Sequence, residues 1–159
     1  MLDENYAFLL IDFQKGITSS IPTPKLQPVV INAKHRLKPF RETNKPVFFI
    51  TCNLFLKNLA ATRCDEPLFS PRADLVAAEA ILQVRHSQRD ITQMIFTGLT
   101  TSFAIVATVI AGLLCGYTLL FPLDALGNDK PVAKAKIKVK KLPNVGQSGQ
   151  TNNLISLIR

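Results

Sequence analysis

The sequence has few of the residues that build disulfide frameworks and metal sites. Its 159 residues include three cysteines and two histidines. Cys52, Cys64 and Cys115 form no C-x-x-C pair and show no other metal-type spacing, and His35 and His86 are the only imidazoles. We therefore expect no metal, no cofactor and a reducing, cytoplasmic compartment. No signal peptide is predicted either, because the apolar run at 7–11 is short and follows acidic residues.

The basic part of the chain lacks aromatic residues. The net charge is +8, but six lysines gather in residues 130–141, whereas Met1–Phe13 is acidic. A nucleic-acid surface has basic residues spread over one face and interleaved with aromatic side chains. The segment 130–141 has no such pattern, so we interpret it as a solvent-exposed face and expect no nucleic-acid partner.

Charge is also absent from a long apolar run, Met94–Asp124, until its last residue. About 20 apolar residues suffice to cross a bilayer, so a small single-pass membrane protein is one interpretation. The other interpretation divides the run into a buried strand–helix–strand unit. Its parts are a strand at Gln93–Phe96, a turn at Thr97–Gly98, a helix at Ser102–Cys115 and a strand at Tyr117–Phe121.

Three glycines favour the strand–helix–strand interpretation. Gly98, Gly112 and Gly116 stand where a turn, a close packing contact and a helix C-cap would need them. The upstream chain also supplies further strands of the same character, which a lone membrane anchor does not need. We therefore regard a membrane partner as disfavoured.

Upstream, two short apolar runs indicate strands at Tyr6–Ile11 and Val47–Thr51. Between them we predict a loop at Thr18–Pro28 and an amphipathic helix at Val29–Glu42. Alternating strands and helices are typical of an α/β fold, and we predict a doubly wound, mostly parallel sheet in a single domain over residues 1–159.

Five further segments are predicted less sharply. Asn53–Pro71 has no period, and Asp74–Arg85 suits a helix slightly better than a strand. The basic stretch Val132–Lys140 is an exposed strand or a helix. At the C-terminal end we predict a short strand at Leu142–Gln147 and a helix at Asn152–Ile158 capped by Thr151.

Asp12 directly follows the first predicted strand. Open α/β sheets bind ligands just outside the carboxyl ends of their strands, so a carboxylate there is a candidate site residue. It could equally cap a turn or a helix, and the sequence leaves both interpretations open.

Four motifs together resemble the isochorismatase-like cysteine hydrolases, over nearly the whole chain and in the family's order. They are IDFQKGI at Ile11–Ile17, FRETNKPVFFI at Phe40–Ile50, FTGLTTSFAIVAT at Phe96–Thr108 and GYTLLFPLDA at Gly116–Ala125. The resemblance implies a Rossmann-like domain that is shortened in the middle and divergent in its basic part, 130–159.

In active members of this family, an Asp, a Lys and a Cys at a helix N-terminus form the catalytic site. The Cys thiolate attacks a carbonyl carbon while backbone N–H groups hold the oxyanion. By this resemblance Asp12 matches the Asp, Ala104 occupies the nucleophile position, and the Lys is lost, with Glu79 at or near its place. Cys115 cannot substitute, because eleven helical residues place it about 16 Å from Ala104.

The resemblance also implies a crevice formed by Leu99, Thr100, Phe103 and Ala104, with a cis peptide at Leu99–Thr100. Ser102-Phe103-Ala104 is most similar to a family branch that lacks the cysteine. The metal-ligand positions of nicotinamidase-type relatives fall in 51–55, which holds no such ligands. We thus expect a small-molecule ligand without thiol-dependent hydrolysis, or else a non-catalytic binding or assembly module.

The all-apolar helix must be covered on every side, which predicts a homo-oligomer.

Overall fold

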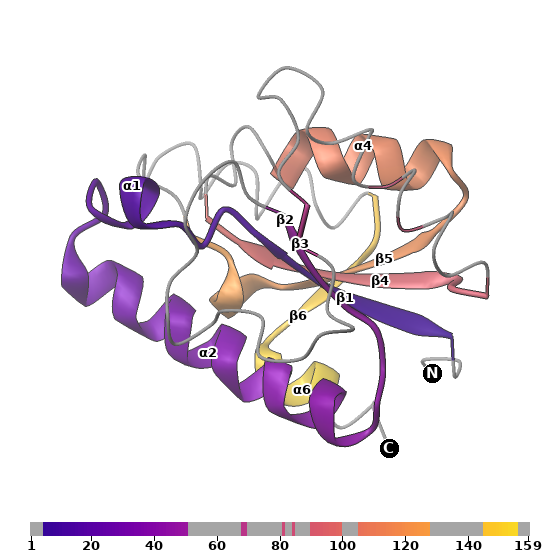
Figure 1. Cartoon of the computed structure of the whole chain (residues 1–159), viewed down its shortest axis with the longest axis horizontal. Coiled ribbons are helices and arrows are strands. Elements are labelled where there is room, and N and C mark those ends of the chain that lie inside the picture. The colour runs from indigo at the N-terminus through magenta and orange to yellow at the C-terminus, as the bar shows by residue number, and fades with distance from the viewer. Residues whose placement is uncertain are drawn as a thin grey trace.

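The computed structural model describes residues 5–50, 68–69, 81, 84, 90–99, 105–127 and 145–155. These residues form a six-stranded parallel sheet with helices on both faces (Figure 1), which confirms the predicted α/β domain. The strands are β1 Tyr6–Ile11, β2 Val47–Ile50, β3 Leu68–Phe69, β4 Gln93–Gly98, β5 Thr118–Pro122 and β6 Gln147–Gly149. The helices are α1 Lys15–Thr18, α2 Thr23–Glu42, α4 Val106–Leu114 and α6 Thr151–Ile155, with a 3₁₀ turn, η2, at Leu123–Ala125.

The strand order is β3-β2-β1-β4-β5-β6, and every neighbouring pair is parallel. The chain therefore builds the sheet outward from β1 to β3 and then restarts beside β1, building from β4 to β6 in the other direction. This is the doubly wound topology that the sequence predicted. The winding direction reverses between β1 and β4, which are in register with Ile11 opposite Gly98.

Alternate side chains of the central strand β1 point to the two faces of the sheet. Leu9 and Ile11 belong to the core under α4, together with Val109. Phe8 and Leu10 belong to the core under α2, together with Phe40. Figure 1 shows α2 and α4 lying on these opposite faces, so the continuous apolar run of β1 is explained by burial on both sides.

Helix α4 confirms the strand–helix–strand interpretation. Gly116 ends it with a φ of 83°, and a Cβ on Gly112 would lie 3.2 Å from Leu119 Cδ2, so both glycines serve the predicted roles. None of the helices in the described ranges is long and apolar enough to cross a membrane.

Helix α2 corrects the predicted loop at Thr18–Pro28. The helix begins at Thr23, not at Val29, with Pro22 as its N-cap and Pro24 in its first turn. Proline is compatible with the first turn, because N–H groups there have no partner within the helix. The proline-rich composition thus marked a helix start rather than a loop.

Three boundaries also differ from the prediction. Thr97 and Gly98 complete β4 instead of forming a turn, and glycine is required because a Cβ at Gly98 would overlap the Ile11 carbonyl oxygen. β3 lies in the stretch expected to be irregular, and β6 begins at Gln147, the last residue of the strand predicted at Leu142–Gln147. Ile81 and Val84 are helical, as the composition of 74–85 favoured. The predictions for 132–140 lie outside the described residues.

Candidate functional site

Asp12 lies at the carboxyl edge of the sheet, directly after β1. Its N–H donates to the Ile50 carbonyl oxygen of β2 at 2.9 Å, and its backbone has a φ of 59°. Aspartate and asparagine tolerate this left-handed conformation better than most residues. Asp12 is only 6% exposed. Gln14, not Asp12, stands at the N-cap position of α1.

Leu99 is the neighbour of Asp12 across the sheet. Because Ile11 and Gly98 are partners in the register, the residues that follow them emerge side by side. The Leu99 N–H donates to the Ile11 carbonyl oxygen at 3.0 Å, and its side chain is fully buried in the core under α2. Leu99 therefore borders the edge with its backbone, while its side chain belongs to the core.

The third segment at this edge follows η2. Leu126 forms a parallel bridge with Gly98, and the Gly127 N–H donates to the Gly98 carbonyl oxygen at 2.7 Å. A Cβ on Gly127 would lie 2.5 Å from Leu99 Cδ2, so a side chain there would displace Leu99. These contacts fix the end of β4, from which the candidate crevice would start.

The position of Asp12 and Leu99 in the sheet topology is the main reason to regard them as candidate site residues. Open α/β sheets bind ligands at the carboxyl ends of the two strands between which the winding direction reverses. Here those strands are β1 and β4, and Asp12 and Leu99 directly follow them. In Figure 1 this edge is the side on which α1 follows β1.

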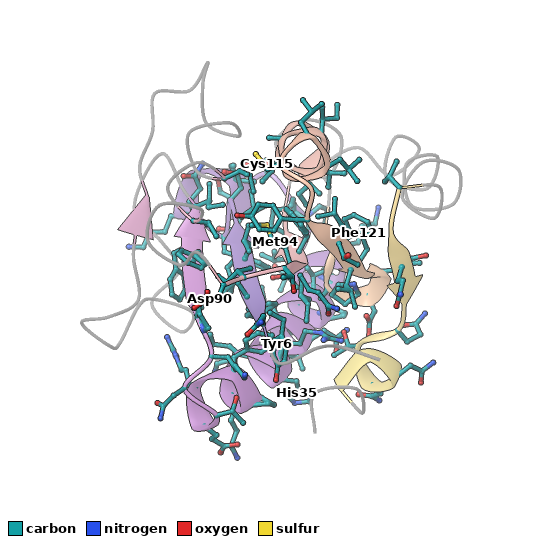
Figure 2. All side chains as sticks on the ribbon, turned by 90° about the vertical axis from the view of Figure 1, so that its right-hand side faces the viewer. Tyr6, His35, Asp90, Met94, Cys115 and Phe121 are labelled. Atoms are coloured by element: carbon teal, nitrogen blue, oxygen red, sulfur yellow. The ribbon has the colours of Figure 1, made fainter. Side chains whose placement is uncertain are left out.

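Four predicted site positions lie outside the described residues: Thr100, Phe103, Ala104 and Glu79. The Leu99–Thr100 peptide bond therefore also remains a prediction. Cys115 is described, and it is the C-cap of α4, half-buried at the far end of the helix (Figure 2). Ile105 and Cys115 are ten helical residues apart, or about 15 Å, so the Cys115 thiol is remote from the helix start.

A polar cluster that the sequence analysis missed joins α2 to the C-terminal segment. The Arg36 side chain is fully buried, and its Nη2 donates to the Thr151 carbonyl oxygen at 2.6 Å. Asp124 Oδ1 accepts from the Thr151 N–H at 2.8 Å and from Thr151 Oγ1 at 2.6 Å. Asn32 Nδ2 donates to the Asp124 carbonyl oxygen at 3.1 Å. The cluster holds α6 and η2 against α2.

Burial lowers the pKa of Arg36 to about 10, and the Asp124 carboxylate partly opposes this shift. Arg36 thus keeps its charge at neutral pH. Its Nε and Nη1 have no hydrogen-bond partner, so the guanidinium is only partly satisfied. The one signal for this cluster in the sequence is an arginine in the apolar stripe that contains Ala33, Leu37 and Phe40.

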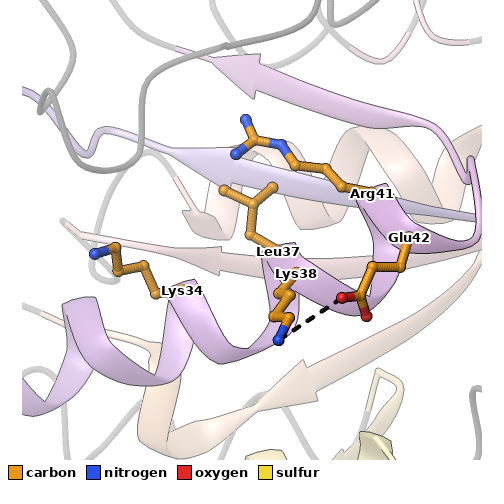
Figure 3. A pocket seen from close by; sticks show the side chains of 5 residues that line it. All are labelled: Lys34, Leu37, Lys38, Arg41 and Glu42. Carbon is orange, nitrogen blue, oxygen red and sulfur yellow. Dashed lines mark ion pairs between the residues drawn. The ribbon is translucent and has the colours of Figure 1, made fainter.

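A hollow of the described surface lies elsewhere. It has a volume of about 360 Å³ and is lined along α2 by Lys34, Leu37, Lys38, Arg41 and Glu42 (Figure 3). These residues lie toward the end of α2 that leads into β2, at the amino edge of the sheet and opposite Asp12. The Lys38–Glu42 ion pair of 3.7 Å is exposed and contributes little. This hollow is separate from the candidate crevice. Among the described side chains, no three of the His, Cys, Asp or Glu type gather as metal ligands.

No protein-family model matches the chain, and no curated protein matches it in sequence. Solved structures do match it in fold. An isochorismatase family protein from Burkholderia thailandensis is similar with a TM-score of 0.83 and 19% identity, over 99% of this chain and 97% of that one. An isochorismatase-like hydrolase from Alkaliphilus metalliredigens is similar with a TM-score of 0.83 and 14% identity, over 98% and 99%.

The YcaC gene product from Escherichia coli, described as an octameric hydrolase of unknown specificity, is similar with a TM-score of 0.77 and 18% identity. The match covers 94% of this chain and 77% of that one. These neighbours show that the chain has the fold of the isochorismatase-like hydrolases, and they confirm the fold that the sequence resemblance implied.

Proposed function

We propose that this chain binds a small molecule in the crevice at the carboxyl ends of β1 and β4 and does so without thiol chemistry. The supporting observation is that Asp12 is held, nearly buried, at the point where the sheet reverses its winding. The sequence supplies the second half of the proposal, because the alanine at 104 has no atom that can attack a carbonyl carbon.

Asp12 is the acid–base group of this proposal. With Ala104 at the nucleophile position and the lysine lost near Glu79, hydrolysis in this crevice requires water as the nucleophile and Asp12 as the group that accepts its proton. The backbone of Leu99, Thr100, Phe103 and Ala104 would surround the ligand, in the place where the resemblance puts the oxyanion donors. The substrate class is a small carbonyl compound or vinyl ether.

A non-catalytic binding module on the same fold is the second candidate. It is favoured by the loss of both the thiol and the lysine from the positions that the resemblance assigns to them. The two candidates share the crevice and differ only in turnover, so one set of assays separates them.

The test combines a small-molecule binding screen, read by thermal shift, with hydrolysis assays on small amides and vinyl ethers. The key variant is Asp12→Asn, because asparagine suits the φ of 59° and keeps the backbone while removing the charge. We expect Asp12→Asn to weaken ligand binding at least tenfold without lowering the melting temperature of the free protein. Iodoacetamide should leave binding and turnover unchanged.

Each outcome decides between the candidates. Turnover that falls in Asp12→Asn and survives alkylation supports a hydrolase that uses water. Ligand binding with no turnover supports the binding module. Turnover that is lost on alkylation, and is lost equally in an untreated variant with one of the three cysteines replaced by serine, overturns the proposal, because a thiol would then serve the reaction.

We also propose that the chain is a cytoplasmic homo-oligomer. The described octameric state of the YcaC neighbour and the apolar character of α4 support the oligomer. The cysteine pattern of the sequence supports the compartment.

A further inference from the structure

Helix α4 presents an apolar surface to the outside of the molecule. Ile110 is 53% exposed, Leu113 is 39% exposed and Leu114 is 84% exposed. The three positions have the i, i+3, i+4 spacing of one helix face. They are three of the four large exposed hydrophobic residues in the described part of the chain, and the fourth is Ile31 on α2. We call Ile110, Leu113 and Leu114 the α4 patch.

The inner side of α4 is already occupied. Thr108 and Val109 are buried, and Gly112 packs on Leu119 of β5. No residue of α4 carries a charge. A helix that is hydrophobic all round is normally covered on all sides. The sheet covers one side of α4, so its patch needs a second cover.

We propose that the α4 patch is the contact between two copies of this chain, which pack α4 against α4 about a two-fold axis. This inference rests on the proposed homo-oligomer and assigns its interface. In such an isologous contact the same patch serves both copies, so one uncharged surface is sufficient. A specific interface buries about 1,200–2,000 Å² in total, which makes the patch the centre of a larger contact.

The absence of charge on this surface favours a second copy as its partner. The chain carries a net charge of +8, so two copies repel each other over most approaches. The α4 patch and the residues that follow it, Cys115 to Thr118, carry no charge. Two copies can therefore meet at this surface without placing like charges face to face, whereas the outer face of α2 would bring Lys34 and Lys38 together.

The same surface is poorly suited to a bilayer. Helices that lie in a membrane interface carry Lys and Arg on their polar face, which anionic lipids attract. Helix α4 has no cation, and its other face is buried on the sheet. A lipid surface therefore gains from α4 only the three patch side chains and no electrostatic attraction.

The test measures molar mass by sedimentation equilibrium and light scattering for the full chain and two matched variants. Leu114→Lys places a charge at the most exposed residue of the patch, and Ile31→Lys places the same charge at an apolar site on α2 whose exposure of 47% is close to the 53% of Ile110. We expect the wild type to be a dimer or larger, Leu114→Lys to weaken its self-association at least 100-fold, and Ile31→Lys to retain the wild-type mass. Thermal unfolding checks that both variants fold, and Ile110→Lys repeats the test at a second patch position.

A second readout uses Cys115, which follows Leu114 at the C-cap of α4 and is half-buried. In a Cys52→Ser, Cys64→Ser background, a short bismaleimide should join two copies through Cys115, and Leu114→Lys should abolish the covalent dimer. A wild type that is monomeric at every concentration overturns the homo-oligomer and the interface together. An oligomer that Leu114→Lys and Ile110→Lys leave intact overturns the interface alone. Wild-type monomers that co-sediment with phosphatidylcholine vesicles overturn it in favour of a lipid surface.

Discussion

Helices α2 and α4 cover opposite faces of the same sheet, but they differ on the sides turned away from it. The outer side of α2 carries Lys34, Lys38 and Arg41, whereas α4 carries no charge at all. Their inner sides pack on opposite faces of the same apolar strands. The inner face of each helix is therefore apolar because it packs on the sheet, and the outer face differs with its surroundings. The charged outer side of α2 suits exposure to water, and for the apolar outer side of α4 we propose contact with a second copy.

The two helices differ in what they contribute to the cores. On the α2 side, the Phe40 ring of the helix stacks on Phe8 with centroids 4.9 Å apart and meets Tyr6 edge to face at 5.2 Å. On the α4 side, the aromatic rings come from the strands, and the helix contributes Val109 and the close approach of Gly112 to Leu119. Aromatic side chains bury more surface than these small residues do. Truncations on α2 should therefore cost more stability than truncations on α4.

The largest predicted effect tests this difference. Phe40→Ala removes a fully buried ring and should lower the free energy of unfolding by about 3–5 kcal/mol. Val109→Ala, a truncation at a buried position of α4, should cost less because the helix contributes fewer buried atoms there. Urea unfolding at neutral pH measures both. Equal losses for the two variants would contradict the proposed difference between the helices.

Much of this arrangement could be predicted because it is local. The apolar runs fixed β1, β2 and β5, and Gly112 and Gly116 located the packing contact and the end of α4. The N-terminal turns of α2 were missed because Pro22, Pro24 and Pro28 indicate a loop in isolation, while the structure uses the first two at a helix start. Asp12 was found from its place after a strand, but only the strand order shows that it lies at the reversal point.

The second prediction concerns the polar cluster on the α2 side. Asp124→Asn removes the carboxylate that faces a buried guanidinium and should lower the free energy of unfolding by about 2 kcal/mol. This loss is below the usual 3–5 kcal/mol for a fully buried ion pair because Asp124 is partly exposed. Arg36→Met should change stability by less than about 1 kcal/mol, since it also removes two unpaired buried donors. Lys38→Met, at an exposed ion pair, serves as the control and should have an effect below about 0.5 kcal/mol.

Chemical unfolding of the three variants at neutral pH measures these differences. A larger loss for Arg36→Met than for Asp124→Asn would mean that the guanidinium contributes net stability. The sequence could not reveal this cluster, because Arg36 and Thr151 are 115 residues apart. No local sequence pattern around either residue predicts the contact, because only the order of the strands in the sheet brings α6 beside α2.

The ends of the two helices give the smallest and most closely matched test. After α4, the Gly116 N–H donates to Leu113 at 3.0 Å and the Tyr117 N–H to Gly112 at 3.1 Å. After α2, the Asn44 N–H donates to Arg41 at 3.3 Å and the Lys45 N–H to Phe40 at 2.9 Å. The pattern is the same, but the left-handed residue is Gly116 at a φ of 83° in one helix and Asn44 at 54° in the other.

Exchanging these residues separates the free-energy cost of a positive φ from effects that are specific to one helix end. Gly116→Ala should lower the free energy of unfolding by about 1–2 kcal/mol, because a Cβ is unfavourable at a positive φ even where nothing else contacts it. Gly116→Asn should lose less, since asparagine tolerates this region, and Asn44→Gly should change stability by about 0.5 kcal/mol or less. Thermal unfolding of the three variants measures the order. If Gly116→Asn lost as much stability as Gly116→Ala, the two helix ends would not be equivalent. The glycine would then be required by a group that packs on the end of α4 rather than by its φ. A second copy that contacts Leu114 would be such a group.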